Sequence, residues 1–235
     1  MNIDCCEYPY NITESSEADF NSQNNSVVLG NSHNGSFLIT SEERNFCCIS
    51  IIGQIEGHHI LPEDTKTTKY ENLIPLIVEC EMSRAISGML FILNTVGGDI
   101  EAGMAIAELI SGLKKPTVSI ILGGGHSIGI PLAVAAKKTF ISESGTMTVH
   151  PVRTSGLVMG VPQQFAYFND MQERIIRFVC KNSSVDDEKF RSMMMNSGQL
   201  IADFGTVLDG NEAVDTGLID SVGTIVDAID ELTKM

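Results

Sequence analysis

The sequence predicts an α/β domain built on a mostly parallel β-sheet, and three observations carry this prediction. Short strand-like segments alternate with helical segments along the chain. The strand-like segments are continuously apolar, as expected when helices cover both faces of a parallel sheet. Glycine-rich turns follow two of them, at 97–98 and 123–125, and α/β proteins build their sites at the carboxyl ends of such strands.

The elements follow from apolar runs, helical periodicity and their boundary residues. The first half of the chain predicts strands at 46–52, 88–94 and 116–122, helices at 71–81, after Gly98 and at 127–136, and short strands at 139–142 and 146–150. The second half predicts a long helix at 161–181, a helix that starts at Asp186 and stops before Gly198, and a short helix at 211–216. Apolar segments at 218–220 and 225–232 close the chain.

The chain divides into two regions of different composition. Residues 1–45 are rich in Asn, Ser, Glu and Asp and hold almost no periodic apolar pattern, which predicts a polar, disordered N-terminal arm. Residues 46–235 carry the apolar segments and are expected to form a single domain. No internal repeat is found.

Charge and hydropathy exclude several classes of function. The net charge is -15, from 15 Lys+Arg against 30 Asp+Glu, which argues against nucleic-acid binding because that function needs a basic surface. No apolar run reaches the roughly 18–20 residues of a membrane span. The N-terminus lacks the basic and apolar regions of a secretory signal, so a cytoplasmic protein is expected.

The six cysteines are expected to be reduced thiols. Four of them form the adjacent pairs Cys5-Cys6 and Cys47-Cys48, and an adjacent pair lacks the Cys-x-x-Cys spacing of a metal site. Cys80 and Cys180 lie in apolar helical patterns, where a free thiol packs as a small apolar side chain. Zinc binding is the minor alternative.

The segment GGGHSIGI, residues 123–130, is the first candidate for chemistry. Ser127 follows a predicted strand at the start of a helix, and residues 125–129 fit the loose pattern G-x-S-x-G of an exposed nucleophile. The glycines would let backbone N–H groups turn toward a developing oxyanion. The alternative is an ordinary helix N-cap, for which serine is also favoured.

A serine nucleophile needs a general base and a group that orients the base. The chain has five histidines, and His150 is the best base because it ends a predicted strand and is followed by Pro151. The competing interpretation is a polar histidine at a strand end. Asp203, in a loop after a Met-rich helix, is the preferred carboxylate among the downstream candidates, which also include Asp170, Asp186, Asp187 and Asp209.

The chain resembles the ClpP class of serine peptidases, within the ClpP/crotonase fold, from about residue 46 to 230. Four blocks carry the resemblance in the same order: NTVGG with EAGMAI (94–98 and 101–106), the serine segment (125–129), MTVHP (147–151) and EAVDTGLID (212–220). The strings GQIEGH, LNTVGGD, HPVR and MQERIIRFV look closer to the translocation-enhancing subgroup of this class than to housekeeping ClpP.

The resemblance implies a fold of repeated β-β-α units with a protruding handle helix, here about residues 153–182. It assigns Ser127 as nucleophile, His150 as base and Asp203, across a small gap, as the triad carboxylate. It assigns the oxyanion-hole amides to Gly98 and Ile128, with Gly97 shaping the turn. The implied activity is a cytosolic serine endopeptidase that cleaves peptides or unfolded protein, with a link to protein export.

The resemblance also implies a homo-oligomer, with the seven-membered rings of ClpP as the reference. Docking to a Clp-type ATPase stays open, since this chain departs from ClpP in its N-terminal arm and in the loop after Arg153. No metal or other cofactor is expected, because a Ser-His-Asp mechanism needs none and the chain has no Walker A string. The alternatives are a catalytically silent scaffold and a crotonase-type acyl-CoA enzyme, which would leave Ser127 and His150 without a joint role.

Overall fold

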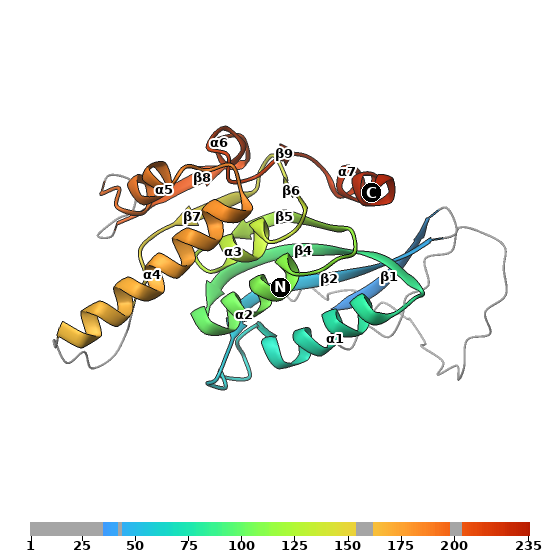
Figure 1. Ribbon diagram of the computed structural model, residues 1–235, viewed down its shortest axis with the longest axis horizontal. Coiled ribbons are helices and arrows are strands. Elements are labelled where there is room, and N and C mark those ends of the chain that lie inside the picture. The colour runs from blue at the N-terminus through green and yellow to red at the C-terminus, as the bar shows by residue number, and fades with distance from the viewer. Residues whose placement is uncertain (1–34, 42–43, 154–161, 198–203) are drawn as a thin grey trace, which may run out of the picture.

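The computed structural model describes residues 35–41, 44–153, 162–197 and 204–235. Within these residues, nine strands are linked by hydrogen bonds and carry helices on both faces (Figure 1). The strands are β1 (Ser36–Ser41), β2 (Arg44–Glu56), β3 (Thr67–Lys69), β4 (Ile86–Gly98), β5 (Thr117–Gly125), β6 (Lys138–Ile141), β7 (Thr146–Val149), β8 (Thr206–Asp209) and β9 (Ser221–Val222). The helices are α1 (Tyr70–Met82), α2 (Ile100–Ser111), α3 (Gly129–Val134), α4 (Pro162–Asn182), α5 (Asp187–Met194), α6 (Gly210–Asp215) and α7 (Ile225–Lys234).

The main sheet has the order β1-β2-β4-β5-β6-β9, and all its neighbours are parallel except the antiparallel pair β1–β2. β3 pairs with β2 in parallel, β7 pairs with β5 in parallel, and β8 pairs with β7 antiparallel. This arrangement confirms the predicted α/β class with a mostly parallel sheet.

Two apolar clusters fill the space between the sheet and its helices. The larger cluster lies between the strands and α1, α2, α3, α4 and α5, and the smaller one lies under α7 on the opposite face. Adjacent residues of β2 therefore face different clusters: Cys47 contributes to the larger and Cys48 to the smaller, as the alternation of side chains along a strand requires.

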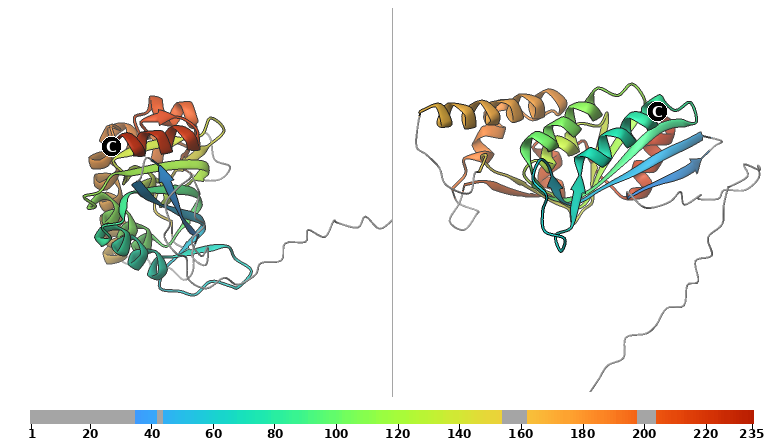
Figure 2. Two further views of the ribbon diagram at one scale, coloured as in Figure 1. Left: turned by 90° about the vertical axis from the view of Figure 1, so that its right-hand side faces the viewer. Right: turned by 90° about the horizontal axis from the view of Figure 1, so that it is seen from below.

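α4 extends away from the sheet at one end of the molecule, as the orange helix at the left of Figure 1 and of the right-hand view in Figure 2 shows. This is the protruding helix that the resemblance implied, although the loop 154–161 before it lies outside the described residues. None of the helices in the described part of the chain is both long and apolar enough to cross a membrane.

The structure differs from the sequence prediction at several element boundaries, and two of these differences have a clear local cause. Residues 36–41, within the stretch expected to be a polar arm, form β1, whose backbone groups pair with β2 from Ser36↔Ile49 to Ser41↔Arg44. The helix expected from residue 127 begins at Gly129, because Ser127 has a positive φ that a right-handed helix does not accept.

Candidate active site

Ser127 lies in a sharp turn between β5 and α3. Its φ is 57°, and it is the one non-glycine residue with a positive φ in the part of the chain that the structure describes. This conformation crowds the β-carbon and costs roughly 1–2 kcal/mol. Two hydrogen bonds hold the turn: the Ser127 N–H donates to the Thr148 carbonyl at 3.0 Å, and the Ile130 N–H donates to the Ser127 carbonyl at 3.0 Å. Backbone strain that is held in this way is typical of functional sites.

The glycines that end β4 give this turn its space. Gly97 has a φ of 91°, and a β-carbon there would lie 2.7 Å from the Ser127 Cβ and 3.3 Å from its Oγ. Gly98 has a φ of 152°, and a β-carbon there would lie 2.3 Å from the Ile55 carbonyl oxygen. Both positions therefore need glycine, for backbone conformation as well as for space. Thr95 supports them, since its Oγ1 accepts from the Gly97 N–H at 3.0 Å.

The backbone of the serine turn leaves one N–H group available. The N–H groups of His126, Ser127, Gly129 and Ile130 donate to carbonyl oxygens, whereas that of Ile128 makes no backbone hydrogen bond among the described residues. Ile128 precedes the first residue of α3, where the N–H groups of a helix have no partner within the helix. Such a group can bind an oxygen that carries negative charge.

His150 reaches the same region from the end of β7. This strand contacts β5 in parallel at Gly124↔Thr146, and its Thr148 carbonyl accepts the N–H of Ser127. The ring of His150 is half-buried, and its Nδ1 lies 2.7 Å from the Pro151 carbonyl oxygen. In the tautomer with the proton on Nδ1, this contact is a hydrogen bond that leaves Nε2 as the basic nitrogen.

Ser127 and His150 line one cavity of about 230 Å³. Gly98 and Ile128 line it too, so four of the six predicted site residues meet there, and Gly97 lies behind Ser127. Asp203 lies outside the described residues. The remaining wall is mainly apolar and consists of Ile100, Ile130, Val149, Pro151, Val152, Ile175, Phe190 and Met194, with Arg153 beside them.

A second histidine, which the sequence did not single out, lies close to His150. The Nδ1 of His126 lies 2.9 Å from the Thr148 Oγ1, and its ring packs over Gly124, where a β-carbon would lie 2.4 Å from Nε2. Burial lowers the pKa of His126, and the nearby charge of His150 lowers this pKa further. His126 is therefore neutral at pH 7. The only sequence signal for it was its position next to Ser127.

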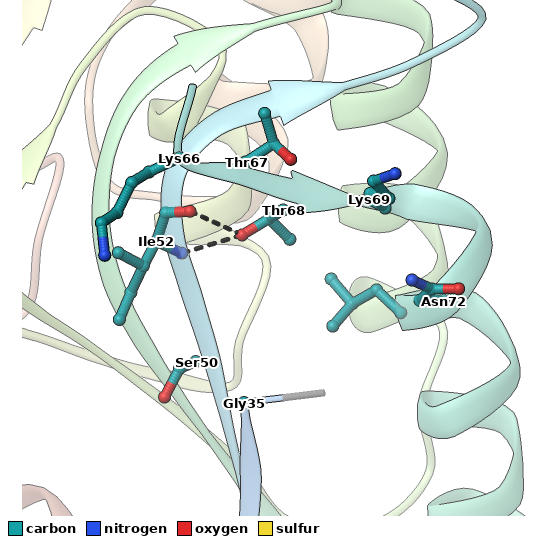
Figure 3. A pocket seen from close by; sticks show the side chains of 9 residues that line it. Gly35, Ser50, Ile52, Lys66, Thr67, Thr68, Lys69 and Asn72 are labelled. Carbon is teal, nitrogen blue, oxygen red and sulfur yellow. Dashed lines mark hydrogen bonds between the residues drawn. The ribbon is translucent and has the colours of Figure 1, made fainter. Parts of the chain in front are cut away.

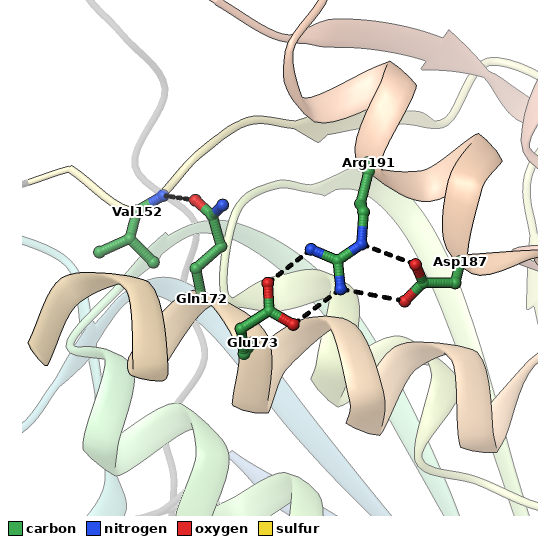
Figure 4. Close-up of polar contacts among 5 residues, drawn as sticks. All are labelled: Val152, Gln172, Glu173, Asp187 and Arg191. Atoms are coloured by element: carbon green, nitrogen blue, oxygen red, sulfur yellow. Dashed lines mark hydrogen bonds and ion pairs between the residues drawn. The ribbon is translucent and has the colours of Figure 1, made fainter. Parts of the chain in front are cut away.

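A polar contact from α4 holds the segment that follows His150, and further contacts join α4 to α5 (Figure 4). The Val152 N–H donates to the Gln172 Oε1 at 3.3 Å. The next residue of α4, Glu173, accepts from Arg191, which also donates to Asp187 of α5, so one guanidinium joins the two helices. The hydrogen bond from Arg191 lowers the pKa of Glu173. These groups are partly exposed, so the contacts orient the helices more than they stabilise the fold.

A larger cavity of about 360 Å³ lies elsewhere, between β2, β3 and the start of α1 (Figure 3). Its wall includes Lys66, Lys69 and Asn72, and the Thr68 hydroxyl in it is bonded to both backbone groups of Ile52. The wall contains no histidine or carboxylate that could activate a hydroxyl. The smaller cavity at Ser127 is therefore the candidate active site.

Comparison with known proteins agrees with this fold and places the chain in a family. The family model for Clp protease matches residues 43–226. The chain belongs to the Clp protease family. It is 55% identical over 194 residues to the translocation-enhancing protein TepA of Halalkalibacterium halodurans, with 83% of this chain and 76% of the relative covered. The resemblance seen in the sequence is thereby confirmed.

Two more distant matches extend the comparison. A Methanocaldococcus jannaschii protein that carries the name of a protease is 24% identical over 207 residues, with 77% of this chain and 65% of the relative covered. The structure of a ClpP1 variant from Listeria monocytogenes matches with a TM-score of 0.61 at 20% identity, covering 77% of this chain and 94% of that chain. The latter match establishes a ClpP-like fold.

Proposed function

We propose that this member of the Clp protease family is a serine endopeptidase that cleaves peptides or unfolded protein chains. The observation that carries the proposal is the strained turn at Ser127, which lines one cavity together with His150. Strain at an ordinary N-cap would serve no purpose, whereas a nucleophile must be held out of the helix and toward the substrate.

In the proposed mechanism, the Ser127 Oγ attacks the carbonyl carbon of the scissile peptide bond, and its proton passes to the Nε2 of His150. The oxyanion that forms accepts hydrogen bonds from the N–H groups of Gly98 and Ile128, while Gly97 lets the two turns approach. His150 then gives the proton to the leaving amine, and water hydrolyses the acyl-enzyme by the same route.

Asp203 is proposed as the carboxylate that orients His150. The antiparallel register of β7 and β8 supports this role, because it pairs Val149 with Thr206. The residues after Val149 and those before Thr206 therefore leave this strand pair at the same end. In the proposed triad the carboxylate takes the place of the Pro151 carbonyl as acceptor for the Nδ1 proton, and it stabilises the imidazolium that forms during the reaction.

Members of the Clp protease family typically assemble into oligomeric rings, and we propose a homo-oligomer for this chain as well. Two aromatic side chains support the proposal: Phe165 is 75% exposed and Tyr167 is 55% exposed on the protruding α4. Enclosure would restrict cleavage in the cytoplasm to chains that enter the assembly. A role in protein export is proposed from the similarity to the translocation-enhancing protein.

The test is covalent labelling with a fluorophosphonate, read by intact mass. The wild-type protein should gain one adduct, and Ser127→Ala and His150→Ala should gain none. Ser111→Ala, at the end of α2, is the matched control and should label like the wild type. A well-folded wild type that gains no adduct, alone or with unfolded protein present, would refute an activated serine and favour a catalytically silent scaffold.

A further inference from the structure

Cys47 and Cys80 form a pair of thiols remote from the candidate active site. Cys47 lies on β2 and Cys80 on α1, and both belong to the larger apolar cluster, with exposed fractions of 3% and 6%. Both side chains line the same cavity, and each shifts the pKa of the other. Two cysteines that are 33 positions apart in the sequence are thus brought together at the helix–sheet interface.

The pair is reachable from the surface in spite of its low exposure. Both residues line a cavity of about 350 Å³, whose wall also includes Leu76, Glu79 and Ile86. A molecule as small as a peroxide can enter a cavity of this size. Cys48, the neighbour of Cys47 in sequence, does not line this cavity, because it points into the apolar cluster on the opposite face of the sheet.

The two thiols have different chemical environments. The hydrogen bond from Cys47 lowers the pKa of Cys80, and the charge of Lys115 acts in the same direction. The Lys115 ammonium is anchored nearby, since it donates to the Cys80 carbonyl. The same contact with Cys80, together with burial, raises the pKa of Cys47. Of the two thiols, Cys80 therefore ionises more readily than Cys47, which favours attack by Cys80 on an oxidant.

We propose that Cys47 and Cys80 form a reversible disulfide when the protein meets a two-electron oxidant of the hydroperoxide class. The Cys80 thiolate attacks one peroxide oxygen and breaks the O–O bond, which gives a sulfenic acid and hydroxide. Cys47 then attacks the sulfenic sulfur, the S–S bond forms, and hydroxide leaves and takes the thiol proton as water. Two thiols are oxidised by two electrons in total, and hydrogen peroxide is reduced to two waters.

Such a disulfide would join α1 to β2 covalently and close the interface between them. Disulfides in reducing compartments are transient and sense the redox state, which fits a pair that is reduced at rest and reachable by peroxide. The protein can thus respond to oxidative conditions through two thiols, those of Cys47 and Cys80, that take no part in the proposed peptidase chemistry.

Peptide mapping of the full-length protein tests the proposal. The protein is treated with hydrogen peroxide, quenched by alkylation without reduction, and cut with trypsin, which separates Cys47 and Cys48 (peptide 45–66) from Cys80 (peptide 70–84). We expect these two peptides to be cross-linked, with the loss of two hydrogen atoms, and to separate after treatment with dithiothreitol. A cross-link from Cys5 or Cys6 would instead carry peptide 1–44.

The adjacent cysteines provide a matched pair of variants. The cross-link should persist in Cys48→Ser and disappear in Cys47→Ser, where dimedone should trap the sulfenic acid of Cys80. If peptides 45–66 and 70–84 of the treated wild type are recovered separately, with their cysteines alkylated, the proposal is wrong. This result does not depend on any variant. A cross-link that persists in Cys47→Ser would overturn the assigned pairing. Dimedone labelling of Cys47 in Cys80→Ser would overturn the assigned order of attack.

Discussion

Gly97 lies directly against Ser127: a β-carbon at position 97 would come within 2.7 Å of the Ser127 Cβ. The end of β4 and the serine turn, about thirty residues apart in sequence, therefore fit only because residue 97 has no side chain. Its φ of 91° excludes other residues for a second reason. This contact joins the turn proposed to carry the nucleophile to the strand proposed to carry one oxyanion donor.

Replacement of Gly97 by alanine should therefore damage both the fold and the chemistry. We expect Gly97→Ala to lower the free energy of unfolding by about 1–3 kcal/mol, because the new side chain is strained and crowded. Peptidase activity should fall by about a hundredfold, since Ser127 is pushed out of place. Urea unfolding and peptide hydrolysis measure the two effects. Gly112→Ala, at a helix end with no close contact, is the control; equal losses in both variants would refute the argument.

His126 makes the stability of the protein depend on pH. Its folded pKa lies below the unfolded value of about 6.5, so the folded state favours the neutral ring. The contribution to stability is fully present above the unfolded pKa and is lost as the pH falls through that value toward the folded pKa. Urea midpoints should therefore drop as the pH falls below about 6.5.

A pair of variants isolates this effect. His126→Asn should flatten the dependence of the urea midpoint on pH, because residue 126 no longer titrates. His59→Asn, at an exposed position, should leave the dependence as in the wild type. A dependence that stays unchanged in His126→Asn would show that other groups cause it.

The role of Asp203 is tested by a change that keeps its size and removes its charge. Asp203→Asn should reduce peptidase activity by at least about a hundredfold, because His150 loses the group that orients it. The elution volume on a sizing column should not change. Asp170→Asn, at an exposed position of α4, is the control and should retain full activity. An active Asp203→Asn protein would refute the proposed triad.

The assembly is tested by size. The protein should elute as a species several-fold larger than the 25.5 kDa of one chain. A double variant with Phe165→Ser and Tyr167→Ser should elute as a smaller species, because two exposed aromatic side chains on α4 no longer take part in contacts. Asn169→Ser on the same helix should leave the size unchanged. A wild type that elutes as a monomer would contradict the proposed oligomer.

Much of the fold follows from local patterns. The apolar runs predicted β2, β4 and β5, although the observed strands extend further, to Glu56, Gly98 and Gly125. The sequence missed the extension of β4 because glycine disfavours strands. In the structure, Gly97 and Gly98 pair with Gln54 and Ile55 of β2, and this pairing, which depends on distant residues, keeps them in the sheet.

The site was predictable only in part, for a related reason. Ser127 and His150 could be proposed from the sequence because each follows a strand end, and parallel topology brings such ends together, here at one cavity. The pair of His126 and Thr148 was missed, since their contact depends on the register between β5 and β7. β1 was missed because a short run of moderate hydropathy becomes a strand only through its partner β2.

The cavity at Ser127 draws its two kinds of groups from different parts of the fold. The groups proposed to react come from the end of β4, the turn before α3 and the end of β7, whereas Ile100, Ile175, Phe190 and Met194 come from α2, α4 and α5. Substitutions on these helices can therefore reshape what the cavity admits while the groups proposed to react keep their spacing. Substrate preference can diverge among relatives, or be redesigned, without rebuilding the reaction.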